Sequence, residues 1–251
     1  MKKLSIHSLA VGLLLATASG TALANTKTVV LVHGAFADGS SWNRVIDQLQ
    51  RQHTEVIAVQ LPLTSLKEDV AATQRAIARA KGDVVLVGHS WGGTVISEAG
   101  NDARVKSLVY VAAFAPDSGQ STADLAGSYP APPGSAGIAK TADGFLYLQD
   151  KSVRQDFAPD LKAAEQNTLT ATQGPIRADA FAEKVTHAAW RDKPSWYVVS
   201  KNDRMINPDL ERAMAKAIHA KTTEVTASHV SMVSQPDVVT RTIEQALSGQ
   251  Q

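Results

Sequence analysis

The chain of 251 residues contains no cysteine. A disulfide framework and a thiolate metal site are therefore excluded, whichever compartment the protein occupies. The sequence also lacks the zinc motif H-E-x-x-H, the phosphate-binding P-loop and the dinucleotide motif G-x-G-x-x-G. These absences argue against a zinc protease, a P-loop nucleotide hydrolase and a dehydrogenase. We expect no metal and no cofactor.

An excess of charge of one sign is absent as well, with 25 Lys and Arg against 24 Asp and Glu. Residues 1–24 have the features of a secretory signal, because two lysines precede an apolar stretch at 9–16 and Ala22-Leu23-Ala24 matches an A-x-A cleavage site. Cleavage removes those two lysines and leaves a domain 25–251 with a net charge of −1. We therefore expect a periplasmic or secreted protein that binds neither nucleic acid nor, after cleavage, a membrane.

Strand and helix signals alternate along the domain. Short β-branched and apolar runs predict strands, and apolar residues three and four positions apart predict helices. The predicted strands are 28–32, 55–59, 83–87, 105–114, 195–200 and 223–227, and the predicted helices are 41–50, 66–80, 93–99, 210–220 and one that begins near Pro236. Such alternation indicates an α/β fold with a mostly parallel sheet and helices on both faces.

One pentapeptide, Gly88-His89-Ser90-Trp91-Gly92, lies between a predicted strand and a predicted helix. The pattern G-x-S-x-G in this context forms a nucleophile elbow, a sharp turn that exposes a strained serine above the sheet. The residues around the serine must be small because the turn brings backbone segments together. We predict that Ser90 is a catalytic nucleophile rather than part of an ordinary turn.

A serine nucleophile needs a general base. His229 follows the predicted strand 223–227 and precedes the last helix, at the sheet edge where the elbow also lies, so we predict that it is the base. His219 lies near the end of a helix, where a cation interacts well with the helix dipole. His53 also lies at a helix end, and nothing marks His187 as a base.

The acid that orients the histidine precedes it in the usual chain order of this motif. Asp203 lies in a polar loop after the strand 195–200, at the carboxyl end where such sheets carry their chemistry, and is the predicted acid. Two alternatives remain. Asp203 forms an ordinary turn, or Asp117 supplies the carboxylate from the end of the earlier strand.

The oxyanion of an acyl-transfer intermediate needs two backbone N–H donors. One is predicted at Trp91, directly after the nucleophile, and the other at Ala35, which precedes Ser90 by 55 residues in the loop after the first strand. We expect His33 to support this loop through hydrogen bonds and not to act as the base. Phe36 and Trp91 are expected to flank the oxyanion hole.

The alternation of strands and helices stops between about 115 and 190. Residues 127–134 are too rich in turn formers for a regular element, and the segment as a whole predicts a cap insertion over the active site. Aromatic residues in such a segment pack most often in the core of the cap. We nevertheless expect a few of them to line an apolar pocket, with Phe145, Tyr147, Phe157 and Phe181 as the candidates.

Together the loop 33–36, the motif 88–93, Asn202-Asp203 and Ser228-His229 resemble the α/β-hydrolase superfamily, over residues 28–247. The chain is most similar to its small single-domain branch, which contains plant methylesterases, hydroxynitrile lyases and bacterial esterase-like proteins. The resemblance implies an eight-stranded sheet, a Ser-Asp-His triad and no cofactor. The lyases of this branch carry a threonine and a lysine where this chain has Gly34 and Val230, which favours a hydrolase.

These features predict a serine hydrolase that cleaves small, apolar carboxylic esters, lactones among them, through an acyl-enzyme. One alternative is cofactor-free C–C or C–N bond cleavage, or oxygenolysis, on the same scaffold. Another is a ligand-binding relative without turnover, against which an intact triad and two oxyanion donors argue. Likeness of fold alone does not identify the substrate.

Overall fold

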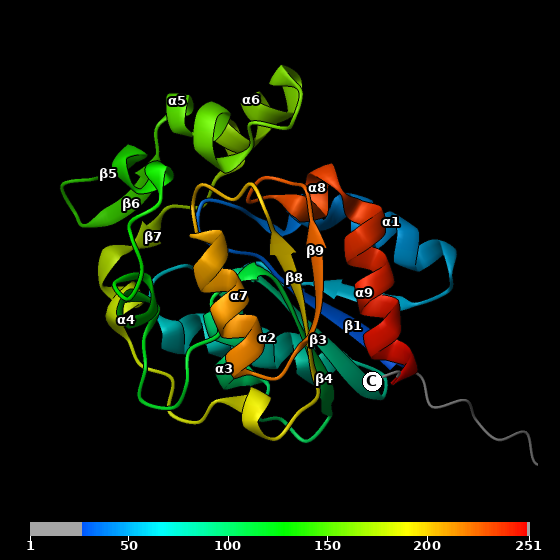
Figure 1. Cartoon of the computed structure of the whole chain (residues 1–251). Helices are drawn as coiled ribbons and strands as arrows, with labels where there is room; N and C mark the ends of the chain where they lie inside the picture. Colours follow the sequence, from blue (N-terminus) through cyan, green and yellow to red (C-terminus); the bar gives the residue numbers. More distant parts are fainter. Residues whose placement is uncertain (1–26, 250–251) are drawn as a thin grey trace, which may run out of the picture.

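The structure is a computed structural model and describes residues 27–249, so the predicted signal segment 1–24 lies outside the described residues. Its centre is a sheet in the order β2-β1-β3-β4-β8-β9, in which every neighbouring pair is parallel (Figure 1). The strands are β1 (Lys27–Val32), β2 (Glu55–Ala58), β3 (Asp83–Ser90), β4 (Val105–Ala113), β8 (Ser195–Ser200) and β9 (Lys221–Val225).

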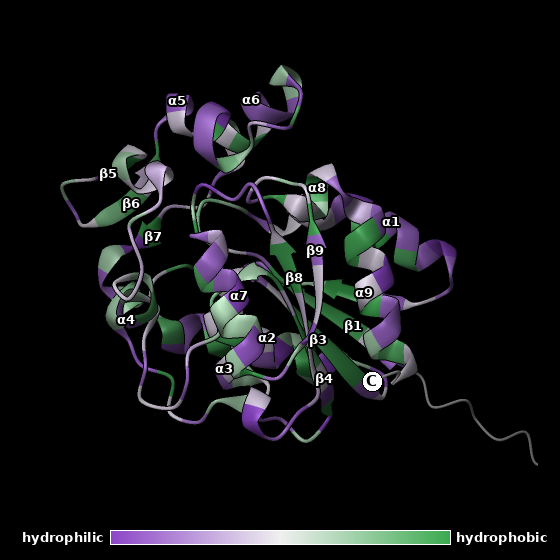
Figure 2. Ribbon diagram, in the orientation of Figure 1, coloured by the Kyte–Doolittle hydropathy of each residue, from purple (hydrophilic) through white to green (hydrophobic). Residues whose placement is uncertain are grey.

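Helices cover both faces of this sheet. Figure 1 shows α1 (Asn43–Arg51) and α9 (Pro236–Ser248) on one side, and α2 (Leu66–Arg79), α3 (Trp91–Ala99) and α7 (Pro208–Ala217) on the other. The central strands β3, β4 and β8 are almost entirely buried and hydrophobic (Figure 2), as strands covered on both faces must be. None of the helices formed by residues 27–249 is both long enough and apolar enough to span a membrane.

Local sequence signals set the ends of these helices. The Ser65 hydroxyl accepts a hydrogen bond from the backbone N–H of Glu68 at the start of α2. Asn207 caps α7 in the same way, and Pro208 occupies its first turn. Gly249, in the left-handed conformation with φ 69°, ends α9.

The predicted fold class is confirmed, but the expected number of strands is wrong. Among the described residues the main sheet has six strands, not eight. The figure of eight came from the family resemblance, whereas the described chain begins with β1, in the interior of the sheet between β2 and β3. Three further strands lie elsewhere, in a small antiparallel sheet β5-β6-β7.

That small sheet belongs to the long segment between β4 and β8, which Figure 1 shows beside and above the carboxyl ends of the main strands. We call residues 114–194 the cap. Its elements are α4 (Thr122–Ala126), a 3-10 turn (Pro133–Gly137), β5 (Ile138–Lys140), β6 (Phe145–Leu148), α5 (Asp150–Ser152), a π-helical turn (Val153–Phe157), α6 (Ala163–Thr172), β7 (Ile176–Arg177) and two 3-10 turns (Ala178–Ala182, Ala189–Arg191).

The cap is joined by polar contacts to the two loops that carry Asp203 and His229. Arg204 Nε donates to Asp156 Oδ1 at 2.9 Å. The carboxylate of Asp160 accepts from both the backbone N–H of Ser228, at 2.9 Å, and its hydroxyl, at 2.5 Å. The cap therefore rests on the residues next to the predicted acid and base.

Candidate active site

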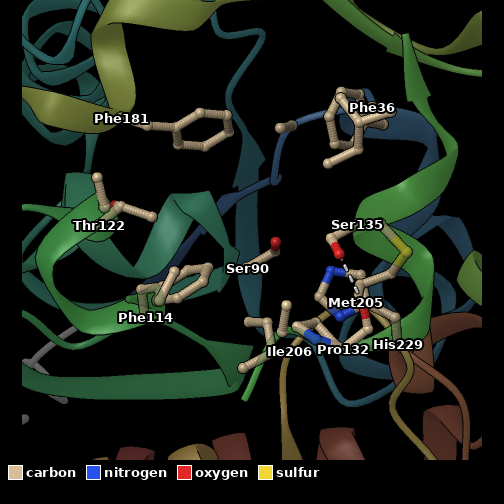
Figure 3. A pocket seen from close by; sticks show the side chains of 15 residues that line it. Phe36, Ser90, Phe114, Thr122, Pro132, Ser135, Phe181, Met205, Ile206 and His229 are labelled. Atoms are coloured by element: carbon tan, nitrogen blue, oxygen red, sulfur yellow. Dashed lines mark hydrogen bonds between the residues drawn. The ribbon is translucent and has the colours of Figure 1, made fainter. Parts of the chain in front are cut away.

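Ser90 lies at the sharp turn between β3 and α3, with φ 52° and ψ −121°. This conformation is strained for a residue with a side chain. The neighbouring glycines allow the turn, because a Cβ at Gly88 would lie 2.5 Å from the Gly92 carbonyl oxygen and one at Gly92 would lie 2.6 Å from the Val32 carbonyl oxygen. Figure 3 shows the Ser90 hydroxyl pointing into a cavity.

The predicted acid and base form a buried pair. His229 Nδ1 donates to Asp203 Oδ2 at 2.5 Å, and both side chains are almost wholly shielded from solvent. This bond fixes the tautomer that leaves Nε2 free to accept a proton. Asp203 follows β8, and His229 lies between β9 and α8 (Ser231–Ser234), so two neighbouring strands bring them together.

Ser90 and His229 line the same cavity (Figure 3). No hydrogen bond joins their side chains within the described part of the chain. Catalytic hydrogen bonds are often long or poorly aligned without substrate and shorten when it binds. The arrangement therefore suits a nucleophile and a base whose mutual hydrogen bond forms when substrate binds.

The competing acid and the other histidines lie elsewhere. The guanidinium of Arg191 binds both carboxylate oxygens of Asp117 and holds the pKa of that carboxyl below its ordinary value. His187 is exposed and pairs with Asp192. His53 follows α1 and His219 follows α7, each with a positive φ, and none of these three histidines lines the cavity.

The loop after β1 lies directly over the nucleophile. Gly34 is required there, because a Cβ at this position would lie 2.7 Å from Cβ of Ser90. Ala35 lines the cavity, and the Phe36 N–H donates to the Gly174 carbonyl of the cap at 3.1 Å. His33 supports the loop, since its Nδ1 donates to the Gly34 carbonyl at 2.8 Å and its Nε2 accepts from the Leu61 N–H at 2.9 Å.

Of the two predicted oxyanion-hole residues, Ala35 lines the cavity and Trp91 directly follows Ser90 in the chain. Trp91 is the first residue of α3, and the first N–H groups of a helix have no acceptor within it. The Trp91 side chain does not line the cavity. Its ring is fully buried and its Nε1 donates to Asp69, whereas Phe36 lines the cavity.

Two buried groups next to the acid–base pair escape sequence analysis. His89 Nε2 donates to the His229 carbonyl oxygen at 2.9 Å. Burial, followed by the neighbouring charge of His229, lowers the pKa of His89 well below its ordinary value and keeps it neutral. No local signal distinguishes it from the other histidines, since its contacts come from residues far away in the chain.

Glu211 is the second such group. It lies on α7, its side chain is wholly buried, and its Oε2 accepts from the Ser200 N–H at 3.0 Å. Burial raises the pKa of Glu211 well above its ordinary value, and the neighbouring charge of Asp203 raises it further. Its other oxygen, Oε1, has no hydrogen-bond partner among the described residues. A glutamate on an amphipathic helix is more typical of an exposed surface.

The cavity has a volume of about 370 Å³, and its walls are almost entirely apolar. It is lined by Ala35, Phe36, Ser90, Phe114, Thr122, Ala123, Ala126, Ala131, Pro132, Ser135, Ile138, Phe181, Met205, Ile206 and His229. Both other hydroxyls are already paired, that of Thr122 with Thr94 at 2.6 Å and that of Ser135 with the Pro132 carbonyl at 2.7 Å.

Of the four cap aromatics expected at the pocket, only Phe181 lines it. Phe157 packs behind the site, with its ring 5.3 Å from that of His229. Phe145 lies under the Arg177 guanidinium, and Tyr147 is exposed. Most of the wall comes instead from α4, the 131–138 segment and two residues of the loop that carries the acid, Met205 and Ile206.

Residues 27–249 contain no group of three or more His, Asp or Glu side chains arranged to hold a metal ion. The polar side chains that line the cavity are those of Ser90, His229, Thr122 and Ser135. These groups suit acyl transfer by a side-chain nucleophile.

Comparison with known proteins places this geometry in a family. Residues 29–242 match the alpha/beta hydrolase family. The alpha/beta hydrolase nvfD of Aspergillus novofumigatus is 27% identical over 241 residues, 87% of this chain and 95% of that protein. The structure is also similar to polyneuridine aldehyde esterase, with a TM-score of 0.76 and 16% identity over 88% of this chain and 99% of that one. A third similar protein is tomato methylketone synthase I in complex with 2-tridecanone, with a TM-score of 0.78 and 18% identity over 90% and 99% of the two chains. This chain belongs to the alpha/beta hydrolase family.

Proposed function

We propose that the protein is a serine hydrolase that cleaves small, uncharged carboxylic esters, lactones among them. The observation that carries the proposal is the meeting of three features in one cavity: a strained Ser90 that lines it, a His229 imidazole bonded to Asp203, and walls without a charged side chain. Strained backbone of this kind clusters at functional sites, where the surrounding structure imposes it.

In the proposed reaction Ser90 Oγ attacks the ester carbonyl carbon while His229 Nε2 takes the hydroxyl proton. Asp203 stabilises the imidazolium through the Nδ1–H bond. The backbone N–H groups of Ala35 and Trp91 stabilise the oxyanion of the tetrahedral intermediate. The intermediate collapses, His229 protonates the departing alkoxide, and the acyl group stays on Ser90. Water, deprotonated by His229, then releases the carboxylic acid and restores the serine.

The walls of the cavity favour an uncharged substrate. Burial of an unpaired charge costs several kcal/mol or more, and no wall residue offers a counter-ion. Because the hydroxyls of Thr122 and Ser135 are already paired, recognition away from the carbonyl relies on apolar contact. A cavity of about 370 Å³ lies at the lower end of the usual range for ligand pockets.

The similar proteins support esters and related carbonyl compounds as ligands. One of them is an esterase, and another binds 2-tridecanone, a ketone with one long alkyl chain. The loop over Ser90 argues against the chemistry of the hydroxynitrile lyases, which belong to the branch of the superfamily that this sequence resembles. Those lyases carry a threonine after the first histidine, and the space at Gly34 is too small for even a Cβ.

The test is a turnover screen of the purified protein on neutral esters of graded acyl and alcohol size, alongside anionic esters, lactones, hydroxynitriles and peptides. We expect turnover of neutral esters, its loss in Ser90→Ala, and weak or no turnover of anionic ones. Release of an aldehyde and cyanide from hydroxynitriles, with no ester turnover, would instead favour bond cleavage without hydrolysis.

From the predicted signal segment 1–24, we further propose that the protein acts in the periplasm or outside the cell.

A further inference from the structure

A carboxylate outside the acid–base pair is buried close to the nucleophile. Asp69 lies on α2, its side chain is fully shielded, and it faces α3. Its Oδ2 accepts from Trp91 Nε1 at 2.7 Å, and its Oδ1 accepts from the Leu63 backbone N–H at 2.8 Å. Neither donor carries a charge. A buried carboxylate without a cationic partner is costly and needs a reason.

The first partner, Trp91, belongs to the catalytic apparatus proposed above. Its backbone N–H is the predicted oxyanion donor that follows the nucleophile. Its side chain is wholly buried and makes an edge-to-face contact with the Phe181 ring, at 5.4 Å between centroids. Since Phe181 lines the cavity, one tryptophan connects the oxyanion hole with a wall of the pocket.

The second partner, Leu63, connects the same carboxylate to the cap. Leu63 has a positive φ of 56°, a conformation that a leucine adopts only when its surroundings impose it. Its carbonyl accepts from the Arg177 N–H of β7 at 2.8 Å. Three residues later, the Leu66 N–H donates to Glu183 Oε2 at 3.0 Å. Asp69 therefore joins α3 to the cap segment 176–183, which carries Phe181.

We propose that Asp69 is a positioning residue for the oxyanion hole, which holds the Trp91 side chain and the Leu63 loop so that the Trp91 N–H faces the reacting carbonyl and Phe181 faces the acyl or alcohol group. This role rests on the ester hydrolysis proposed above. It assigns no contact between Asp69 and substrate.

The ionisation of Asp69 makes this role testable. Burial raises the pKa of Asp69 to about 6 despite the two N–H donors, which lower it, and the charges of Glu183 in the cap and Glu68 on α2 add to the rise. A protonated carboxyl has fewer acceptor sites than a carboxylate, because one of its oxygens carries a proton. As the pH falls through about 6, the hold on Trp91 or on Leu63 therefore weakens.

The direct test follows the indole N–H of Trp91 by ¹H–¹⁵N NMR in the unliganded protein. The chain has four tryptophans, and the Trp91→Phe spectrum identifies the signal. We expect the Trp91 signal to shift with a midpoint near pH 6 in the wild type and not in Asp69→Asn. Trp190, whose Nε1 donates to the Pro116 carbonyl, serves as an internal control that should stay still. A Trp91 signal that does not titrate would overturn the proposal.

Kinetics test the consequence for catalysis. Asn at position 69 keeps the shape but has one acceptor oxygen for two donors, so kcat should fall about tenfold to a hundredfold with KM little changed, because an oxyanion donor acts on the transition state. On the acid side of the plot of kcat against pH, Asp69→Asn should show one ionisation fewer than the wild type, because the Asp69 carboxyl is gone. Arg75→Gln, an exposed change on the same helix whose charge is not among those that shift the pKa of Asp69, is the matched control and should leave kcat unchanged.

Trp91→Phe removes the donor in place of the acceptor and should lower kcat to a similar extent, which keeps the test open if Asp69→Asn does not fold. Wild-type kcat in a folded Asp69→Asn protein would overturn the proposal. If no variant, wild type included, hydrolyses esters while the Trp91 signal still titrates near pH 6, the ester hydrolysis fails and the link between Asp69 and Trp91 stands.

Discussion

Asp203 holds His229 with one carboxylate oxygen and is itself held by the other. Oδ2 accepts from His229 Nδ1 at 2.5 Å, and Oδ1 accepts from the backbone N–H groups of Met205 and Ile206, at 2.6 and 2.9 Å. The loop that carries Asp203 thus fixes the direction of its carboxylate independently of the contact with His229. The same two residues, Met205 and Ile206, line the cavity, so substrate contact and acid orientation share one loop.

This geometry predicts opposite effects for two aspartates. Asp203→Asn keeps the shape but favours the wrong imidazole tautomer, a change that costs about 10⁴ in kcat in the serine-protease case. We expect a loss of several orders of magnitude here. Asp117→Asn, in contrast, breaks only the pairing with Arg191 and should have a small effect. Measured kcat values for the two purified variants check this, and the reverse pattern would assign the acid to Asp117.

Glu211 predicts a pH effect on stability. Its pKa is raised in the folded protein, so the folded state keeps this proton longer than the unfolded state does. Its contribution to stability therefore declines as the pH rises above its ordinary value of 4.5. Glu211→Gln mimics the protonated carboxyl. The difference in melting temperature between this variant and the wild type should therefore shift in favour of the variant as the pH rises. A difference in melting temperature that stays constant from pH 5 to 9 would contradict a raised pKa of Glu211.

A second pair of variants separates an element of the cavity wall from a neighbour outside it. Phe181→Ala enlarges the cavity and removes the contact with Trp91, so KM for small esters should rise and bulkier esters should be accepted. Phe145→Ala changes a cap aromatic that does not line the cavity and should leave the preference unchanged. The ratio of kcat/KM for large and small esters measures the difference. An equal shift in both variants would mean that the cap acts through its stability alone.

Export predicts a defined processing site. When the full chain is expressed in a Gram-negative bacterium, we expect the mature protein to begin at Asn25 and to be recovered from the periplasm or the medium. Intact-mass measurement of the purified protein decides the cleavage position. A chain that keeps its first residues and stays in the cytoplasm would contradict the proposed location.

The sequence predicts well whatever depends on neighbouring residues. The strand–serine–helix order around Ser90 and the position of Asp203 directly after β8 are local features, and the structure has both. The strand β8 matches the predicted range 195–200, while β9 begins two residues earlier than expected. Ends shift in this way because strand length depends on the partner strand as well as on composition.

Features that depend on distant contacts escaped prediction. Phe145 and Tyr147 lie on a short strand of the cap sheet, and which side of it faces the cavity is set by how that sheet docks. Asp69 and Glu211 look like exposed helical carboxylates, because their partners Trp91, Leu63 and Ser200 come from other elements. The number of strands was inferred from a resemblance and not from the residues, and it is the part of the fold that was wrong.

The most direct measurement of the central claim is the stoichiometry and site of labelling by a fluorophosphonate, which reacts with activated serines. The proposed mechanism predicts one adduct per chain, located on Ser90 by peptide mass spectrometry, together with complete loss of ester turnover. It also predicts no adduct in a folded Ser90→Ala protein. Labelling at another residue, or full ester turnover by Ser90→Ala, would contradict a Ser90 nucleophile.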